Sequence, residues 1–172
     1  MKKTLLFFAF IAFSFSSKAQ YEINWLSFEE AIELNKKNPK LILIDIYTDW
    51  CGYCKKMDKE TYSNKVIANY INTNFYAIKL DGEGKEDIIF KGYTFKYKKE
   101  GKSGYHELSA TLQNGKLSYP TTIFMTEKEE LLQNIPGYLS KERFEKILGF
   151  FNESAYKTES WETYEKNFKS NL

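Results

Sequence analysis

Cysteine and histidine are scarce in this sequence, and their scarcity excludes two classes of protein. The 172 residues include two cysteines and one histidine. Two cysteines cannot supply the several crosslinks that hold small secreted domains together, so the fold must depend on a hydrophobic core. Two cysteines and one histidine also fall short of the four ligands of a structural zinc site. We therefore expect neither a disulfide framework nor a bound metal.

An excess of charge of either sign is also lacking. The 25 basic residues nearly balance the 23 acidic ones, and the lysines are scattered among glutamates and tyrosines instead of being clustered. A protein that binds nucleic acid or anionic lipid through its charge needs a concentrated basic surface. We therefore expect no nucleic-acid partner.

The apolar stretch at residues 5–15 is too short to cross a bilayer, which takes about 20 residues. A pair of lysines precedes this stretch, and Ser17-Lys18-Ala19 places small residues before Gln20. This order is typical of a secretory signal peptide. We expect residues 1–19 to be cleaved and the mature protein to be exported to the periplasm. An uncleaved membrane anchor is the alternative, which the short apolar stretch disfavours.

Both cysteines lie in the motif Cys51-Gly52-Tyr53-Cys54, which follows an apolar run at residues 41–47. Such a run, rich in β-branched residues, is typical of a strand buried on both faces. After a short turn the motif opens a segment of helical character, whose unpaired N–H groups and positive dipole end favour a thiolate. Two intervening residues leave the sulfurs about one helical turn apart, close enough to bridge. The sequence predicts a disulfide that opens and closes reversibly.

Helix and strand signals alternate through the rest of the chain. A capping box at Ser27–Glu30 opens a helix that ends near Pro39. After the dithiol helix, Ser63 is expected to cap a second helical piece, and Ser140 a final helix. Strands are expected at residues 75–80, 122–126 and 131–135. The last two strands are close enough for an antiparallel hairpin, whereas the earlier helix–strand alternation requires parallel pairing with a crossover helix.

Residues 81–104 interrupt this alternation. Apolar and polar side chains alternate there around Lys91-Gly92, which predicts an inserted hairpin or extended excursion. Residues 105–114 then suggest a short helix, with His106 as a polar residue at its start. We expect residues 152–172 to add a packing helix whose apolar face carries Trp161, Tyr164 and Phe168.

In their order along the chain, these features resemble the thioredoxin fold. Asp45 lies six positions before Cys51, Lys79 lies on the next strand, and Tyr119-Pro120 precedes a later one. The motif Trp50-Cys51-Gly52-Tyr53-Cys54-Lys55 is most similar to that of exported thioredoxin-related proteins. These include the periplasmic reducing domain of the DsbD-type membrane electron conduit.

The resemblance implies one α/β domain over residues 20–151, with a central mixed sheet of about four to five strands flanked by helices. Residues 81–104 exceed the corresponding connection in thioredoxin and are therefore expected to be an insertion. The Gly52-Tyr53 pair also differs from the Gly-Pro of thioredoxin and resembles the pair of a periplasmic disulfide isomerase.

Four residues are expected to carry the chemistry. Cys51, exposed at the helix start near basic residues, attacks a client disulfide, and Cys54 resolves the mixed disulfide. An inert structural disulfide is the alternative. Asp45 lies in an apolar run, so burial should raise its pKa and let it accept the proton of Cys54. The resemblance implies that Lys79 pairs with Asp45; the alternatives are an Asp45 that only satisfies local backbone groups and a solvated Lys79.

A second set of residues is expected to bind the client chain. The resemblance implies a cis peptide bond at Pro120, with the backbone of Tyr119 hydrogen-bonding an incoming extended segment. An ordinary trans proline at a strand start is the alternative. Trp50, Gly52 and Tyr53 flank the sulfurs and are expected to form a docking surface, with plain packing as the alternative for the two aromatic residues.

The sequence therefore predicts an exported thiol:disulfide oxidoreductase that acts on client proteins without a metal or organic cofactor. The dipeptide between the cysteines lacks the histidine of strongly oxidising relatives, which favours a reductase or isomerase over an oxidase. A reductant in an oxidising compartment needs electrons, so a membrane electron conduit of DsbD type is the expected donor. The alternative is a client-binding or chaperone module in which the dithiol is a redox latch.

Overall fold

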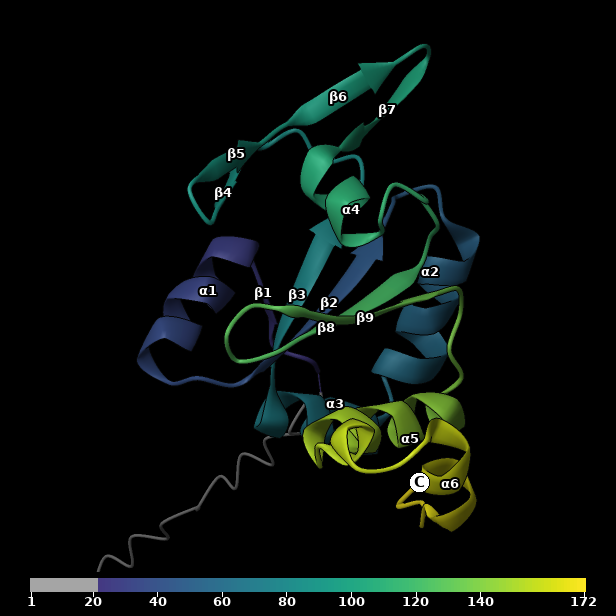
Figure 1. Ribbon diagram of the computed structural model, residues 1–172. Coiled ribbons are helices and arrows are strands. Elements are labelled where there is room, and N and C mark those ends of the chain that lie inside the picture. Colours follow the sequence, from purple (N-terminus) through teal and green to yellow (C-terminus); the bar gives the residue numbers. More distant parts are fainter. Residues whose placement is uncertain (1–21) are drawn as a thin grey trace, which may run out of the picture.

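The computed structural model describes residues 22–172, so the predicted signal peptide lies outside the described residues (Figure 1). The centre of the fold is a five-stranded sheet in the order β1-β3-β2-β8-β9. Its strands are Trp25–Leu26 (β1), Leu41–Tyr47 (β2), Phe75–Asp81 (β3), Thr121–Met125 (β8) and Leu131–Pro136 (β9). The first three run parallel, and β8 and β9 are antiparallel to their neighbours. The predicted mixed sheet with flanking helices is confirmed.

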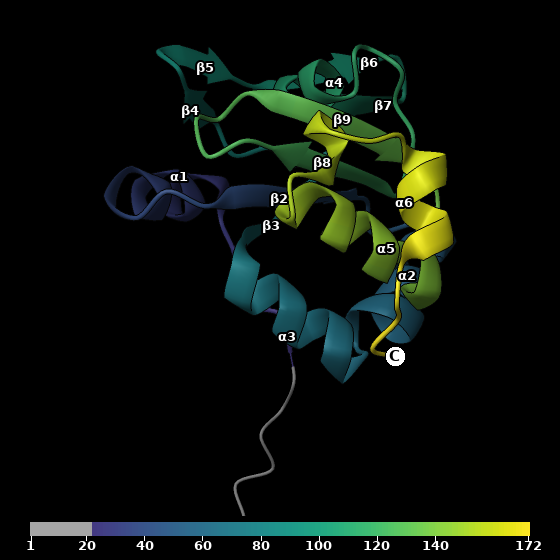
Figure 2. The same ribbon diagram turned by 60° about the horizontal axis from the view of Figure 1, so that its bottom comes forward.

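Helices cover both faces of this sheet (Figure 2). One face carries α1 (Phe28–Lys37) and α4 (Glu107–Leu112). The other carries the longer helices and the C-terminal segment: α2 (Gly52–Met57), a single π-helical turn η1 (Asp58–Tyr62), α3 (Lys65–Asn74), α5 (Lys141–Asn152), a 3-10 turn η2 (Ala155–Lys157) and α6 (Trp161–Asn167).

Strand β2 is buried on both sides because its alternate residues enter different cores. Ile42, Ile44 and Ile46 pack with α1 and α4, whereas Leu43 packs with α3 and α5. Successive side chains of a strand point to opposite faces. Asp45 therefore lies on the same face as Leu43, which is the face that carries the dithiol helix.

The local signals at the helix starts are largely confirmed. Ser27 and Glu30 form the predicted capping box of α1. The prediction that Ser63 caps the second helical piece was wrong, because Asn64 accepts hydrogen bonds from the first N–H groups of α3. Ser63 still has helical dihedral angles and ends the π-helical turn, so it cannot take the extended conformation that a capping residue needs.

The insertion contains two hairpins. The first pairs β4 (Ile88–Phe90) with β5 (Tyr93–Phe95) across Lys91-Gly92, as the sequence predicted, and both turn residues have positive φ. The second pairs β6 (Tyr97–Glu100) with β7 (Ser103–His106), which lies mostly within the predicted excursion and extends past residue 105, where a helix was expected to start. The helix begins later, at Glu107, because Tyr105 and His106 complete the β7 ladder first.

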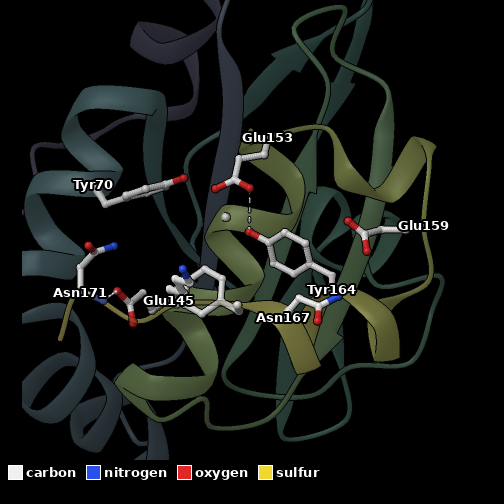
Figure 3. Close-up of a pocket in the computed structure, with 10 residues that line it drawn as sticks. Tyr70, Glu145, Glu153, Glu159, Tyr164, Asn167 and Asn171 are labelled. Atoms are coloured by element: carbon white, nitrogen blue, oxygen red, sulfur yellow. Dashed lines mark hydrogen bonds between the residues drawn. The ribbon is translucent and has the colours of Figure 1, made fainter.

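The C-terminal segment packs on α5. Aromatic rings of α6 contact Phe150, with Trp161 at 5.4 Å and Tyr164 at 5.3 Å between centroids. This docking leaves a cavity of about 340 Å³ between α3, α5 and the C-terminal segment, where the Tyr164 hydroxyl donates to Glu153 at 3.1 Å. Figure 3 shows the residues that line it and this hydrogen bond. Among residues 22–172, none of the helices has the length and apolar content to cross a membrane.

Candidate active site

The two cysteines lie at the start of α2, after the short turn that connects it to β2. A turn closed by the Cys51 N–H and the Thr48 carbonyl at 3.1 Å places Cys51 at the N-cap of α2. Its Sγ accepts a hydrogen bond from the Cys54 N–H at 3.1 Å and is bonded to the sulfur of Cys54. The predicted Cys51–Cys54 disulfide is formed. The hydrogen bond from the Cys54 N–H at the helix start would stabilise the Cys51 thiolate once the disulfide is reduced.

The expectation that Cys51 is exposed was wrong for this disulfide state. Cys51 is 4% exposed and Cys54 3%. As the N-cap, Cys51 turns its side chain back over the first helical turn toward Cys54, which leaves little of the sulfur open. The neighbouring Trp50 and Tyr53 are each 66% exposed, so aromatic surface, and not sulfur, dominates this end of the sheet.

Asp45 lies on β2, six residues before Cys51, where it is buried and paired with a lysine. Lys79 occupies the matching register position on β3, and its Nζ lies 2.7 Å from Asp45 Oδ2. Neither oxygen of Asp45 accepts a well-aligned hydrogen bond from the described residues, so this ion pair is its main polar contact. Burial raises the pKa of Asp45, and Lys79 only partly opposes that effect. The Asp45 carboxylate therefore has a raised affinity for a proton and is suited to accept one.

Lys79 is held by a second carboxylate and by aromatic rings. Asp58, on η1, forms an ion pair with the same ammonium group. The rings of Trp25, Tyr47 and Tyr62 lie 4.9, 5.2 and 5.2 Å from Nζ. Burial lowers the pKa of Lys79, but the two carboxylates outweigh it and the net pKa is raised. The cation is therefore retained beside Asp45.

Sequence reasoning missed Asp58 and Tyr62. Asp58 follows Cys54 by four residues, one helical turn, so its spacing could have placed it near the dithiol helix face. Tyr62 gave no such signal. It is buried with no hydrogen-bond partner for its hydroxyl among the described residues, and burial together with the nearby Asp45 raises its pKa well above the ordinary range. It stays protonated at any physiological pH.

The proposed docking residues come together beside the disulfide. The peptide bond between Tyr119 and Pro120 is cis, and the Tyr119 ring meets that of Trp50 edge-on at 5.9 Å. The Trp50 indole N–H donates to Glu83 Oε1 at 3.1 Å, which the sequence did not suggest. A Cβ on Gly52 would meet no other described residue within 4 Å, so this position faces open space.

The two ends of the insertion are hydrogen-bonded next to the docking residues. Gly82 N–H donates to the Tyr47 carbonyl at 2.7 Å, and the His106 N–H donates to the Gly82 carbonyl at 2.7 Å. A Cβ at position 82 would lie 2.7 Å from Tyr119 Cζ, so only glycine lets the Tyr119 ring sit against this backbone. The insertion is thereby anchored to the residues around the dithiol.

His106 is a structural residue here, as the sequence suggested. It is buried and caps α4, with Nδ1 accepting the Leu108 N–H at 3.2 Å and Nε2 lying 3.0 Å from the Glu86 carbonyl. This network assigns the proton to Nε2. Within residues 22–172, histidine, cysteine and acidic side chains form no cluster that could hold a metal ion.

The fold and the site define a protein of thioredoxin architecture with a C-x-x-C disulfide at the start of its second helix. The chain belongs to the thioredoxin-like domain family, whose model matches residues 28–152.

Solved structures agree with this assignment. A thioredoxin-fold protein from Helicobacter pylori superimposes with a TM-score of 0.58 at 18% identity, over 75% of this chain and 84% of that one. A putative disulphide-isomerase from Bacteroides thetaiotaomicron gives a TM-score of 0.54 at 24% identity, over 81% and 97%. At these identities the likeness concerns the fold.

Curated relatives match over shorter segments. The thiol:disulfide interchange protein DsbD of Pectobacterium atrosepticum is 36% identical over 36 residues, which cover 21% of this chain and 6% of that protein. The first relatives found are also much longer proteins, of which the matched segments span 10%, 9% and 8%.

Proposed function

We propose that this protein is a thiol:disulfide oxidoreductase that exchanges disulfides with client proteins. The observation that carries the proposal is the Cys51–Cys54 disulfide at a helix N-cap, on the sheet face that also buries Asp45. Membership of the thioredoxin-like family supports the same class of chemistry. No metal or organic cofactor is needed, because the two sulfurs store and release the electron pair.

The exchange has two steps. The reduced Cys51 thiolate attacks one sulfur of a client disulfide, forming a mixed disulfide and releasing one client thiolate. Cys54 then gives its proton to Asp45 and attacks Cys51 Sγ, which restores the Cys51–Cys54 bond and releases the second client thiolate. The client gains two electrons and the protein loses two. Asp45 suits the second step because burial has raised its pKa.

Client binding is assigned to the surface beside the dithiol. Trp50 and Tyr53 supply exposed aromatic area next to Cys51, and open space surrounds Gly52. Tyr119, at the cis bond with Pro120, offers backbone groups to an extended segment. Because the sulfurs are nearly covered, a client sulfur must approach along this aromatic edge.

The favoured direction is reduction or isomerisation. The Gly52-Tyr53 dipeptide carries no cationic or histidine side chain that would stabilise the Cys51 thiolate strongly, and a highly stabilised thiolate is what makes a dithiol strongly oxidising. The relative named for disulfide interchange is in keeping with this proposal. The leader pattern of residues 1–19 adds export to the periplasm, where a DsbD-type membrane conduit would supply electrons.

Two measurements test the function. The fully reduced protein should reduce the interchain disulfides of insulin, seen as precipitation of the free B chain. Equilibration with glutathione should give a reduction potential near the roughly −270 mV of thioredoxin, whereas a value near roughly −120 mV would indicate an oxidase. If the folded protein does not reduce insulin, whatever the potential of the reductant that regenerates it, the proposal is contradicted.

A client-binding module is the second candidate, because large apolar side chains are exposed at two places. Trp50 and Tyr53 lie at the dithiol, and Ile89 and Tyr93, 66% and 56% exposed, lie on the first hairpin. A double Cys51→Ser/Cys54→Ser variant decides between the candidates. Undiminished suppression of client aggregation by this variant, together with negligible insulin reduction by the wild type, would favour the binding module.

A further inference from the structure

Three charged side chains form a line from the interior to the surface behind the dithiol. The Asp45 side chain is 1% exposed, that of Lys79 19%, and that of Asp58 47%. Lys79 contacts both carboxylates, at 2.7 Å on the Asp45 side and by a direct ion pair on the Asp58 side. Burial therefore decreases step by step along a continuous set of ionic contacts.

This line ends in a groove that is separate from the docking surface. A cavity of about 390 Å³ has a lining of seven residues: Glu22, Ile23, Trp25, Asp58, Tyr62, Ser63 and Lys79. None of Trp50, Tyr53 and Tyr119 lines it. A client seated against the dithiol would cover the aromatic edge and leave this groove open to water.

Proton exchange between Asp45 and solvent is coupled to the proposed mechanism. Each oxidation of the dithiol leaves the proton of Cys54 on Asp45, which either keeps it for the next reduction of Cys54 or exchanges it with solvent. Asp45 itself is fully buried, and Cys51 and Cys54 are only 4% and 3% exposed. Solvent cannot collect the proton through the dithiol while a client is bound.

We propose that Asp45 returns its proton to solvent through Lys79 and Asp58, at the groove behind the dithiol. This inference rests on the proposed function. In the step, the Lys79 ammonium passes one proton to Asp58 as it takes the proton of Asp45, so the lysine keeps its charge. Asp58 then releases its proton to water. No electrons move, and the net change is one proton from Asp45 to solvent.

The two tyrosines around the pair do not offer this route. The titratable side chains that face it from the packed elements are Tyr47 on β2, Asp58 and Tyr62 on η1, and Glu22 ahead of β1. Both tyrosines have raised pKa values, chiefly through burial. Each therefore keeps its hydroxyl proton at neutral pH and does not release it to water. Asp58 is the carboxylate in contact with Lys79 that also reaches solvent.

The test compares Asp58→Asn with Glu60→Gln. Glu60 is an exposed carboxylate on the same π-helical turn, but it pairs with Lys56 at 3.9 Å and accepts from Tyr138 at 2.7 Å instead of touching Lys79. With saturating insulin and reductant, Asp58→Asn should lower the kcat plateau roughly tenfold at unchanged KM. Glu60→Gln should match the wild type, and Asp58→Glu should recover most of the rate. High concentrations of acetate buffer should restore kcat to Asp58→Asn by collecting the proton at the groove.

A purely electrostatic role gives a different result. The negative charge of Asp58 raises the pKa of Asp45, so its removal alone would move the pH–rate profile to lower pH and leave the plateau at its wild-type height. An unchanged plateau overturns the relay, provided that the wild type is active. So does a lowered plateau that acetate does not restore, if Asp58→Asn has the same thermal stability as the wild type. A wild-type protein that does not reduce insulin overturns the proposed function first, and the relay with it.

Discussion

The ammonium nitrogen of Lys79 lies 2.7 Å from Oδ2 of Asp45, although the two residues come from different strands and are 34 positions apart. The parallel pairing of β2 and β3 sets this contact, because it places the two residues opposite one another on one face of the sheet. A carboxylate is thus kept in the interior beside a cation, on the face that carries the dithiol.

The Asp45→Asn variant should be more stable than the wild type at neutral pH. The folded-state pKa of Asp45 is raised by burial, so its ionised form destabilises the folded state at pH values above that raised pKa. The cost fades as pH falls through the raised pKa, and it is absent below the ordinary pKa of about 4. Removing the carboxylate should therefore raise the free energy of unfolding at neutral pH, since Lys79 keeps Asp58 as a partner.

Urea unfolding of the oxidised protein at neutral pH and at about pH 4 checks this sign. The gain should shrink toward zero in acid. A variant less stable than the wild type at neutral pH would show instead that the ion pair outweighs the cost of burying the charge.

The same Asp45→Asn change should slow disulfide exchange. Without the proton acceptor, the Cys54 thiol must lose its proton to water before it attacks, so release of the mixed disulfide should slow by roughly tenfold to a hundredfold. The loss should be largest at pH values above the raised pKa of Asp45, where its carboxylate is ionised in the wild type. Stopped-flow measurement of tryptophan fluorescence during insulin reduction gives the rate; an unchanged pH–rate profile would remove Asp45 from the mechanism.

The two cysteines should fail in different ways when replaced by serine. Cys51→Ser should reduce insulin only at the uncatalysed rate, because the attacking sulfur is gone. Cys54→Ser should also lose turnover but retain Cys51, so it should accumulate a mixed disulfide with the client. Non-reducing gel electrophoresis and intact mass spectrometry detect that adduct. Adducts formed equally well by Cys51→Ser would reverse the two assignments.

Trp50 should matter for protein clients and not for small disulfides. Its ring is 66% exposed beside Cys51 and is fixed by Glu83 and Tyr119, so Trp50→Ala removes docking area of the kind that dominates protein interfaces. KM for insulin should rise roughly tenfold, while the rate with a small aromatic disulfide should stay near the wild-type value. Leu131→Ala, at an exposed apolar residue of β9, is the control.

Gly149→Ala should destabilise the packing of the C-terminal segment. A Cβ on this glycine of α5 would meet the Tyr164 hydroxyl and lie 3.1 Å from Phe168 Cε2. Alanine is favoured over glycine in helices by up to about 1 kcal/mol, but overpacking should win and lower the free energy of unfolding by about 1–3 kcal/mol. Thermal unfolding measures the difference.

The exposed Glu142→Ala on the same helix should remain within about 0.5 kcal/mol of the wild type. Tyr164→Phe combined with Gly149→Ala should recover part of the loss, because it removes the oxygen that the new methyl group meets. A stabilised Gly149→Ala protein would mean that the segment moves aside without cost.

Short-range patterns in the sequence were sufficient for much of the fold. The capping box at Ser27–Glu30, the spacing of Cys51 and Cys54 and the turn at Lys91-Gly92 are all confirmed. Each depends on hydrogen bonds or dihedral angles within a few residues, so the chain's own order decides them. The alternation of β2 between two cores is equally local, because a strand turns successive side chains to opposite faces.

Only the tertiary structure decided which charges and rings meet. The second ion pair of Lys79, with Asp58, depends on how the π-helical turn packs over β3, and the hydrogen bond from Trp50 to Glu83 depends on where the insertion begins. The near-complete burial of Cys51 likewise comes from its position as a helix cap. Periodicity specifies the face on which a residue lies, but its partners, and hence its burial and proton affinity, are fixed only when separate elements pack together.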